Sequence, residues 1–206
     1  MHRREFLQTT AAVPLLARKW TSAPPAKYLA ELSTLMRAAP VPGAVIGAIG
    51  NRDVVWIAPL GICTPASGKT VTSTTLFHVA SLTKQVTAYA AFALRAQGKL
   101  DFDRPLVSYV DDLPNELARK VTIRHVLSHS SGFPNWRWVE ASKPIPDLAP
   151  AFAPGSRYQY SGEGFFYLQR VMERVTGHGI GQLVHELVFQ PLGMTSSSLV
   201  WNPATL

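Results

Sequence analysis

The sequence predicts an α+β protein in which a β-hairpin near the amino end is followed by helices almost to the carboxyl end. Two short apolar runs, 43–49 and 54–57, flank the turn at 51–53, as in a hairpin of two buried strands. Later segments repeat apolar residues every three or four positions, which is the period of a helix. The chain has 206 residues, of which 47% are hydrophobic and 16% charged, so it can bury a core.

Five helices are expected, and most have a recognisable stop signal. The first ends before Pro40. The second is rich in alanine and ends before Gly98, where a glycine commonly follows a helix. The last two end at Gly177 and Pro191. The predicted helices span residues 28–36, 81–97, 122–127, 164–175 and 181–189.

Two longer segments are predicted to be loops. Residues 64–75 are polar and contain five threonines, and residues 134–154 contain five prolines, which no regular element tolerates. Residues 101–110 are expected to turn and then form a short helix or extended piece. A two-stranded sheet is marginal alone, and nothing after Met194 is long enough to complete it. The fold is therefore expected to be incomplete at the carboxyl end.

The first residues resemble a twin-arginine export signal. Arg3 and Arg4 precede Phe6 and Leu7, and a short, weakly apolar run follows. Export receptors read such paired arginines as an address, whereas the run is far shorter than the ~20 residues of a spanning helix. The alternative is a cytoplasmic tail with accidental arginines.

This resemblance sets the expected domain limits and location. Residues 1–23 would be the export signal, with Ala17 and Ala23 as possible cleavage points, and residues 24–206 would form the folded part. The export machinery is then an expected partner, and the location is periplasmic or extracellular. No stable membrane span is expected.

The net charge of +7 does not indicate binding to nucleic acid. Residues 1–19 contribute +3 of it, and the other basic residues are spread out, without a basic stripe interleaved with aromatic residues. Cys63 is alone in the chain, so no internal disulfide is possible. We expect it to be a small apolar filler.

Residues 81–84 read Ser-Leu-Thr-Lys, a Ser-x-x-Lys sequence at the start of the alanine-rich helix. At this spacing Ser81 and Lys84 share a helix face, with Cβ atoms roughly 5–6 Å apart. A lysine can accept the proton of a serine hydroxyl if burial lowers its pKa, and no charged residue lies between Lys84 and Arg95. Free N–H groups at the helix start can donate to an oxyanion. The alternative is a capping serine and a solvated lysine.

Tyr160 is a second candidate. It follows Pro154 and Gly155 and precedes a predicted helix start, where a side chain can point into a cleft. The ordinary pKa of tyrosine is about 10, so a phenolate base needs a cation beside it, and Lys84 could supply one. The alternative is a buried tyrosine that donates one hydrogen bond.

His125 and His129 are weaker candidates for the base of a Ser-His-Asp triad. No Gly-x-Ser-x-Gly sequence surrounds a serine, and a histidine in a tight turn more often binds backbone groups. Their spacing of four residues would suit a metal, but no acidic residue in that turn completes a site. No metal and no cofactor are expected. His78 is expected to serve in packing.

Four blocks in order resemble the serine β-lactamase and penicillin-binding protein family, in the branch of class C β-lactamases and family VIII esterases. They resemble the family's nucleophile block, its His-Thr-Ser-Gly-Leu turn, the approach to its Tyr-x-Asn motif, and the block that closes its helical region. The four blocks lie at residues 77–84, 121–134, 154–161 and 191–194.

The resemblance covers residues 28–200 and implies a β-lactamase-like fold, with an antiparallel sheet flanked by helices and an all-helical subdomain. It implies that Ser81 is the acylated nucleophile, Lys84 its proton acceptor or electrostatic partner, and Tyr160 the second base. The reaction would be hydrolysis of an ester, amide or β-lactam carbonyl through an acyl-enzyme. The partner would be a small-molecule or peptidoglycan-like substrate.

Two departures from the family pattern matter. Gly162 stands where the Tyr-x-Asn motif has an asparagine, which contacts a substrate amide in the β-lactamases, so an esterase-like or peptidase-like enzyme is favoured. The family's Lys-Thr-Gly or His-x-Gly strand, which supplies an oxyanion N–H, is not found before Leu206. We therefore expect little activity from this chain, and the alternative is a truncated or inactive relative that binds a ligand without turnover.

Overall fold

The computed structural model describes residues 23–51, 53–66, 68–113, 115–137 and 148–201. Residues 1–22, which hold nearly all of the expected export signal, lie outside the described residues. The chain divides into two compact units, the first ending at Leu76 and the second beginning at Phe77. None of the helices formed by the described residues has the length and apolar character that a membrane crossing requires.

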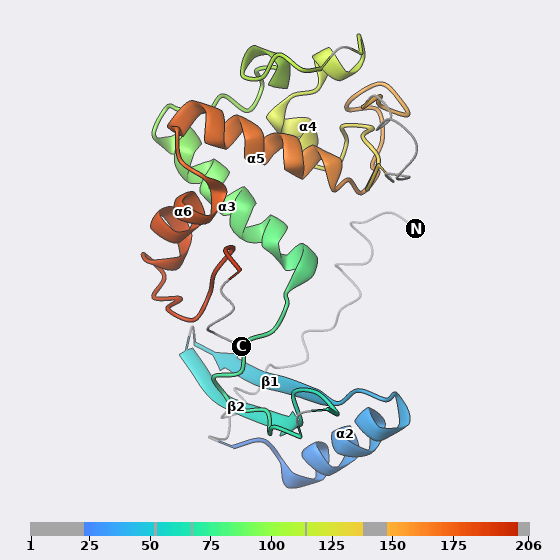
Figure 1. Ribbon diagram of the computed structural model, residues 1–206, viewed down its shortest axis with the longest axis vertical. Coiled ribbons are helices and arrows are strands. Elements are labelled where there is room, and N and C mark those ends of the chain that lie inside the picture. The colour runs from blue at the N-terminus through green and yellow to red at the C-terminus, as the bar shows by residue number, and fades with distance from the viewer. Residues whose placement is uncertain (1–22, 52, 67, 114, 138–147, 202–206) are drawn as a thin grey trace, which may run out of the picture. The chain divides into compact units, whose positions relative to one another are not determined.

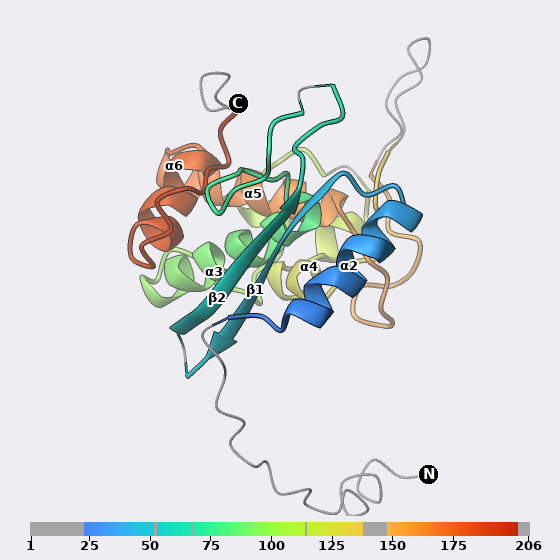
Figure 2. The same cartoon turned by 90° about the horizontal axis from the view of Figure 1, so that it is seen from below.

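The first unit contains the predicted hairpin. β1 (Gly43–Gly50) pairs antiparallel with β2 (Asp53–Gly61), and α2 (Ala26–Ala38) precedes them and lies beside the hairpin in Figures 1 and 2. The first predicted helix and both strands are therefore confirmed. β2 continues past Ile57, its predicted end, because Pro59 lies in a strand that pairs on one edge only among the described residues, where a missing N–H is tolerated.

One face of the hairpin remains exposed. Val45, Ile49, Val54 and Ile57 lie on this face, and their exposed fractions range from 36% at Val45 to 72% at Ile49. The prediction that both strands are buried is wrong for these side chains. The described residues form a sheet of only two strands, which offers little apolar surface for them to pack on.

The second unit is helical. Its α-helices are α3 (Thr83–Ala96), α4 (Ile123–Leu127), α5 (Glu163–Thr176) and α6 (Ile180–Val184). Short 3₁₀ turns cover Ala80–Leu82, Leu106–Ser108 and Ala118–Lys120, and a π-helical turn covers His185–Phe189. Together with the hairpin of the first unit, these helices confirm the α+β class.

The core of the second unit forms where α5 packs against α3 and α4 (Figure 1). Each helix contributes an apolar stripe, as its sequence period predicts. Fully buried residues of this core are Ala90, Ala91 and Leu94 from α3, Ile123 and Val126 from α4, and Leu168, Val171 and Met172 from α5. The core therefore holds α5 against α3 and α4, the helices and turns that carry the site.

The ends of α3 and α5 agree with the sequence signals, whereas the start of one predicted helix and the second half of another differ from the prediction. Gly98 and Gly177 follow α3 and α5 with φ angles of 72° and 74°, a left-handed conformation that glycine adopts without strain. The helix predicted from residue 81 begins instead as the 3₁₀ turn, and α3 starts at Thr83. The helix predicted over 181–189 changes to a π-helical turn after Val184. The described parts of both predicted loops contain no helix or strand.

Candidate active site

Ser81 and Lys84 lie together at the start of α3. Ser81 is the middle residue of the 3₁₀ turn, and Lys84 lies in the first turn of α3, so their side chains share one face. Lys84 Nζ donates a hydrogen bond to Ser81 Oγ at 3.3 Å. Ala80, just before Ser81, has a φ of 43°, a conformation that is strained for a residue with a Cβ and is concentrated at functional sites.

Tyr160 joins this pair from a segment almost 80 positions further along the chain. Lys84 Nζ lies 5.0 Å from the centroid of its ring. Hydrogen bonds to Lys84 and, secondarily, to Ser81 lower the pKa of the Tyr160 hydroxyl. The ammonium group stabilises the phenolate more than the phenol, so Tyr160 is biased toward the form that accepts a proton. The three residues selected from the sequence therefore converge.

A backbone donor is also available at the nucleophile. Leu82 N and Thr83 N are bonded to Val79 O and Ala80 O, whereas Ser81 N has no acceptor in the hydrogen bonds of the described residues. A free N–H beside the attacking oxygen is the kind of group that stabilises an oxyanion.

His129 supports Tyr160 and does not act on Ser81. Its Nδ1 accepts a hydrogen bond from Ser161 N at 3.1 Å, and its ring lies 4.5 Å from the ring of Tyr160. This confirms the expectation that a histidine in this turn binds a backbone group. Burial and, to a lesser extent, the charge of Lys84 lower the pKa of His129, so the neutral imidazole is favoured.

His125 has a structural role at the start of α4. Thr122 Oγ1 accepts from His125 N, and His125 Nδ1 accepts from Thr122 N, which is a reciprocal capping box. His78 stacks on Trp201 with ring centroids 5.6 Å apart, in agreement with its expected packing role. Among the described residues, no three His, Cys, Asp or Glu side chains gather in a way that could hold a metal ion.

A buried polar network anchors the segment that carries Tyr160. Ser161 Oγ donates to Pro134 O at 3.0 Å and accepts from Gly164 N at 2.9 Å, which caps the start of α5. Glu163, 7% exposed, accepts two bonds from Arg137, one from its backbone N–H at 3.1 Å and one from its guanidinium at 3.0 Å. This network was not predicted from the sequence, although a serine just before a predicted helix is a capping signal.

Gly162 is required by a close approach of two backbones. A Cβ at this position would lie 2.5 Å from the carbonyl oxygen of Asn135 and 3.0 Å from its Oδ1. A side chain at residue 162 could therefore not be accommodated without moving the segment that holds Asn135. The departure from the Tyr-x-Asn pattern is thus built into the packing, and the carboxamide of Asn135 lies beside it.

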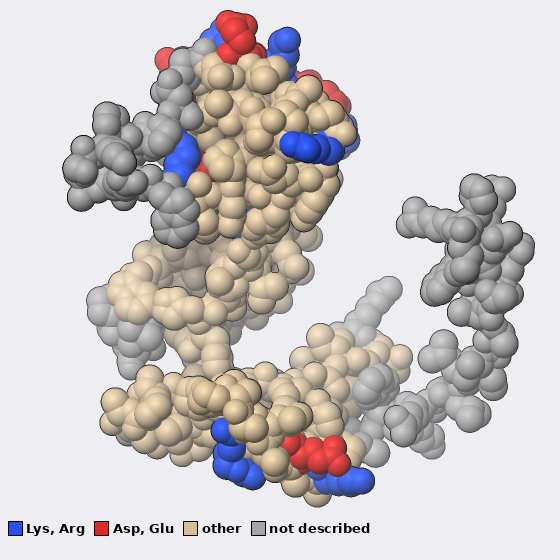
Figure 3. Space-filling model, turned by 90° about the vertical axis from the view of Figure 1, so that its right-hand side faces the viewer, with Lys and Arg blue, Asp and Glu red and all other residues tan. Residues whose placement is uncertain are grey.

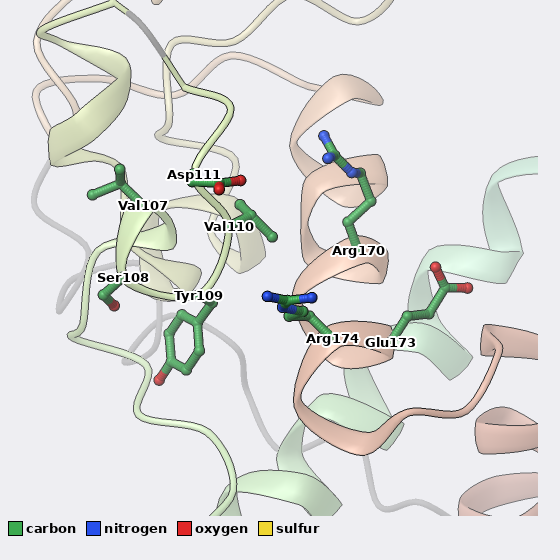
Figure 4. Close-up of a pocket in the computed structure, with 8 residues that line it drawn as sticks. All are labelled: Val107, Ser108, Tyr109, Val110, Asp111, Arg170, Glu173 and Arg174. Atoms are coloured by element: carbon green, nitrogen blue, oxygen red, sulfur yellow. The ribbon is translucent and has the colours of Figure 1, made fainter.

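A cavity of about 510 Å³ lies at the opposite end of α5 (Figure 4). It is lined by the 107–111 segment and by Arg170, Glu173 and Arg174 of α5. Its lining residues on α5 lie seven to eleven positions after Glu163, so the cavity is roughly 10–17 Å along the axis from the start of α5. Ser108 is the serine that lines this cavity, and its hydroxyl donates a hydrogen bond to Pro105 O. We therefore place the candidate active site at Ser81 and not in this cavity.

The charged surface is mixed in sign. Figure 3 shows basic and acidic side chains next to one another on each unit, and on this face they do not form a continuous basic stripe. The described surface seen in this view therefore offers no feature typical of a nucleic-acid interface.

The fold and the arrangement of serine, lysine and tyrosine correspond to a class of proteins that includes serine hydrolases. A family model described as Beta-lactamase matches residues 30–204, and the chain belongs to this family. Its relatives include proteins named as an esterase, penicillin-binding proteins and class C β-lactamases. These names support serine hydrolase activity at the level of the family.

Three relatives illustrate the similarity. Esterase EstB of Burkholderia gladioli is 31% identical over an alignment of 185 positions, and the match covers 77% of this chain and 47% of the esterase. Penicillin-binding protein 4 of Amycolatopsis lactamdurans is 28% identical and covers 76% of this chain and 44% of its own. A solved class C β-lactamase has a TM-score of 0.75 at 25% identity, over 85% of this chain and 50% of its own. The chain thus spans about half the length of these relatives.

Proposed function

We propose that the chain carries the acylation centre of a serine hydrolase, with Ser81 as nucleophile, Lys84 as its electrostatic partner or proton acceptor, and Tyr160 as the second base. The observation that carries this proposal is the convergence of the three residues: Lys84 Nζ lies 3.3 Å from Ser81 Oγ and 5.0 Å from the centroid of the Tyr160 ring. Lys84 and, secondarily, Ser81 lower the pKa of the Tyr160 hydroxyl. A positioned base is what an otherwise weak serine nucleophile requires.

In the acylation step, Ser81 Oγ attacks the carbonyl carbon of a bound ester or amide. The Ser81 O–H bond breaks, and its proton passes to the oxygen of the Tyr160 phenolate or, if Lys84 is the acceptor, to the nitrogen of its neutral amine. The carbonyl electron pair moves to the oxygen, where the free Ser81 N–H can donate to it. The intermediate then expels an alcohol or amine, which takes up the proton, and water releases the acyl group from Ser81 by the same sequence of transfers.

For the substrate, we propose an ester or a peptide-like amide in preference to a β-lactam. The absence of a side chain at Gly162 removes the motif's asparagine, and the packing of Asn135 against Gly162 prevents its simple replacement. The similarity to a protein named as an esterase supports the same choice.

Labelling with a serine-directed fluorophosphonate tests the nucleophile. We expect a single adduct on Ser81 and none on Ser81→Ala. Ser73→Ala is the control, because Ser73 is also exposed and belongs to the first unit, whereas the site is built from the second. A labelled wild type that hydrolyses a short-chain p-nitrophenyl ester faster than a chromogenic cephalosporin would support the esterase. Faster cephalosporin hydrolysis would contradict the substrate choice, and unlabelled but ligand-binding protein would favour the alternative of an inactive relative.

We also propose that residues 1–23 direct export to the periplasm or beyond, and that residues 24–206 form the exported domain. The adjacent Arg3 and Arg4 support this proposal. A reporter fused after residue 23 should be exported, and replacement of both arginines by lysine should retain it in the cytoplasm. Export that does not depend on the two arginines would contradict the signal.

A further inference from the structure

His129 holds the segment that carries Tyr160 from both sides. Its backbone carbonyl accepts a hydrogen bond from Gln159 N at 2.7 Å, and its Nδ1 accepts from Ser161 N at 3.1 Å. These two bonds engage the residues immediately before and after Tyr160. The tyrosine is thus bracketed by a single residue, whose own φ of 52° directs both groups toward the segment.

The ring of His129 also supports the ring of Tyr160 directly. The two ring centroids are 4.5 Å apart, and the ring planes make an angle of 30°. The ring of Phe165, from α5, has its centroid 5.4 Å from that of His129, with an interplanar angle of 39°. Tyr158 contacts His129 by its edge at 5.9 Å. Contacts of this kind stabilise an aromatic pair beyond the area that they bury.

The bond to Ser161 fixes the protonation state of the imidazole. A backbone N–H can only donate, so Nδ1 must carry a lone pair, and the ring proton must lie on Nε2. A doubly protonated imidazolium has no acceptor and cannot make this bond. The geometry around Tyr160 therefore requires neutral His129.

We propose that His129 is a positioning residue that aligns Tyr160 with Ser81 through its neutral Nδ1, so that protonation of His129 releases the tyrosine and slows the activation of the serine. This inference rests on the proposed function, because it assigns His129 a role only through Tyr160.

The groups around His129 set the pH at which its imidazole would be protonated and Tyr160 released. Lys84 from α3 is the charged group that acts on it, Tyr158 and Tyr160 are the titratable groups that face its ring, and Phe165 from α5 is apolar. Burial first and Lys84 second lower its pKa from the ordinary 6.5. The bond to Ser161 is therefore intact above that value and is lost as the pH falls through the lowered pKa.

Two substitutions separate positioning from simple packing. In His129→Asn, the side-chain oxygen takes the place of Nδ1 as an acceptor, asparagine tolerates positive φ, and the residue no longer titrates. In His129→Ala, the acceptor and the ring are both lost. His178→Asn is the matched control, because His178 is exposed beyond the far end of α5.

The measurement is the second-order rate of fluorophosphonate labelling of Ser81 from about pH 5 to about pH 9, a range that spans the titration of a histidine. At pH 8 we expect His129→Asn to label within about threefold of the wild type and His129→Ala about tenfold or more slowly, since misplacement of a reacting group by about 1 Å can cost 10²-fold. As the pH falls through the lowered pKa of His129, the wild type should slow relative to His129→Asn, whereas His178→Asn should follow the wild type throughout.

Two results would overturn the inference: a His129→Ala variant that labels like the wild type, or a constant rate ratio of wild type to His129→Asn across the pH range. The second result decides the matter even if His129→Ala does not fold. Failure of the proposed function is distinguishable, because it would appear as a wild-type protein that is not labelled on Ser81 at any pH.

Discussion

The two sides of the candidate site are built in different ways. Ser81 and Lys84 come from one stretch of four residues at an exposed helix start, and a single hydrogen bond links them. Tyr160 comes from a segment that is fixed by three hydrogen bonds of the fully buried Ser161. Ser161 N donates to His129, Ser161 Oγ donates to Pro134 O, and Ser161 Oγ accepts from Gly164 N at the start of α5. Substitutions on the serine side should therefore change chemistry alone, whereas substitutions on the tyrosine side should change stability as well.

The largest effect is expected from Lys84→Met, which removes the ammonium group and retains the apolar stem. The rate of Ser81 labelling should fall by about 10³-fold or more, because the bond to Ser81 Oγ and the cation beside Tyr160 are lost together. The urea midpoint of unfolding should not change, since the residue lies at the edge of the core. A large loss of stability would contradict the view that the serine side is structurally independent.

Tyr160→Phe should reduce labelling by about 10²-fold and also change its pH dependence. Hydrogen bonds to Lys84 and Ser81 lower the pKa of Tyr160 below the ordinary 10. The wild-type rate should therefore rise with pH through a midpoint below 10, as the phenolate forms. The phenylalanine variant should lack this rise, and an unchanged profile would exclude Tyr160 as a base.

Glu163→Gln tests the buried network on the tyrosine side. It weakens the pairing with Arg137 at a site where Glu163 is 7% exposed, so the free energy of unfolding should fall by about 2–3 kcal/mol in urea denaturation. Asp103→Asn is the control, because the Asp103–Arg124 ion pair is exposed and should leave the urea midpoint unchanged. Equal effects of the two substitutions would show that the network does not anchor the segment.

The smallest effect is expected from Gly162→Ala, which places a methyl group 2.5 Å from Asn135 O. The neighbouring segment must shift, at a cost of about 1–2 kcal/mol in the free energy of unfolding. Gly179→Ala should be nearly neutral, because a Cβ there meets nothing within 4 Å.

A side chain at residue 162 also has no room to reach a substrate, because Asn135 O lies 2.5 Å from the position of its Cβ. Gly162→Asn should therefore not increase cephalosporin hydrolysis, and an increase would contradict the steric explanation.

The same division explains what the sequence could predict. The Ser-x-x-Lys pair, the hairpin around residues 51–53 and the helix ends at Gly98 and Gly177 depend on neighbours within a few positions, so local patterns identify them. Tyr160 is identified through the family pattern, since its own local sequence favours a buried structural tyrosine.

The remaining features depend on segments that are far apart in the sequence. The approach of Asn135 to Gly162 and the pairing of Arg137 with Glu163 arise from tertiary packing, which no local pattern records. The 3₁₀ turn before α3 and the π-helical turn after α6 are changes of hydrogen-bond register within an otherwise helical pattern of residues. The exposed face of the hairpin was missed because an apolar run indicates a strand but not what covers it.

The central claim is that Ser81 is an activated nucleophile whose partners are Lys84 and Tyr160. The most direct measurement is fluorophosphonate labelling followed by mass spectrometry of the digested protein. We expect one adduct, on the peptide that contains Ser81, formed much more slowly in Lys84→Met and Tyr160→Phe. An adduct on a different serine, or equal rates in the wild type and both variants, would contradict it.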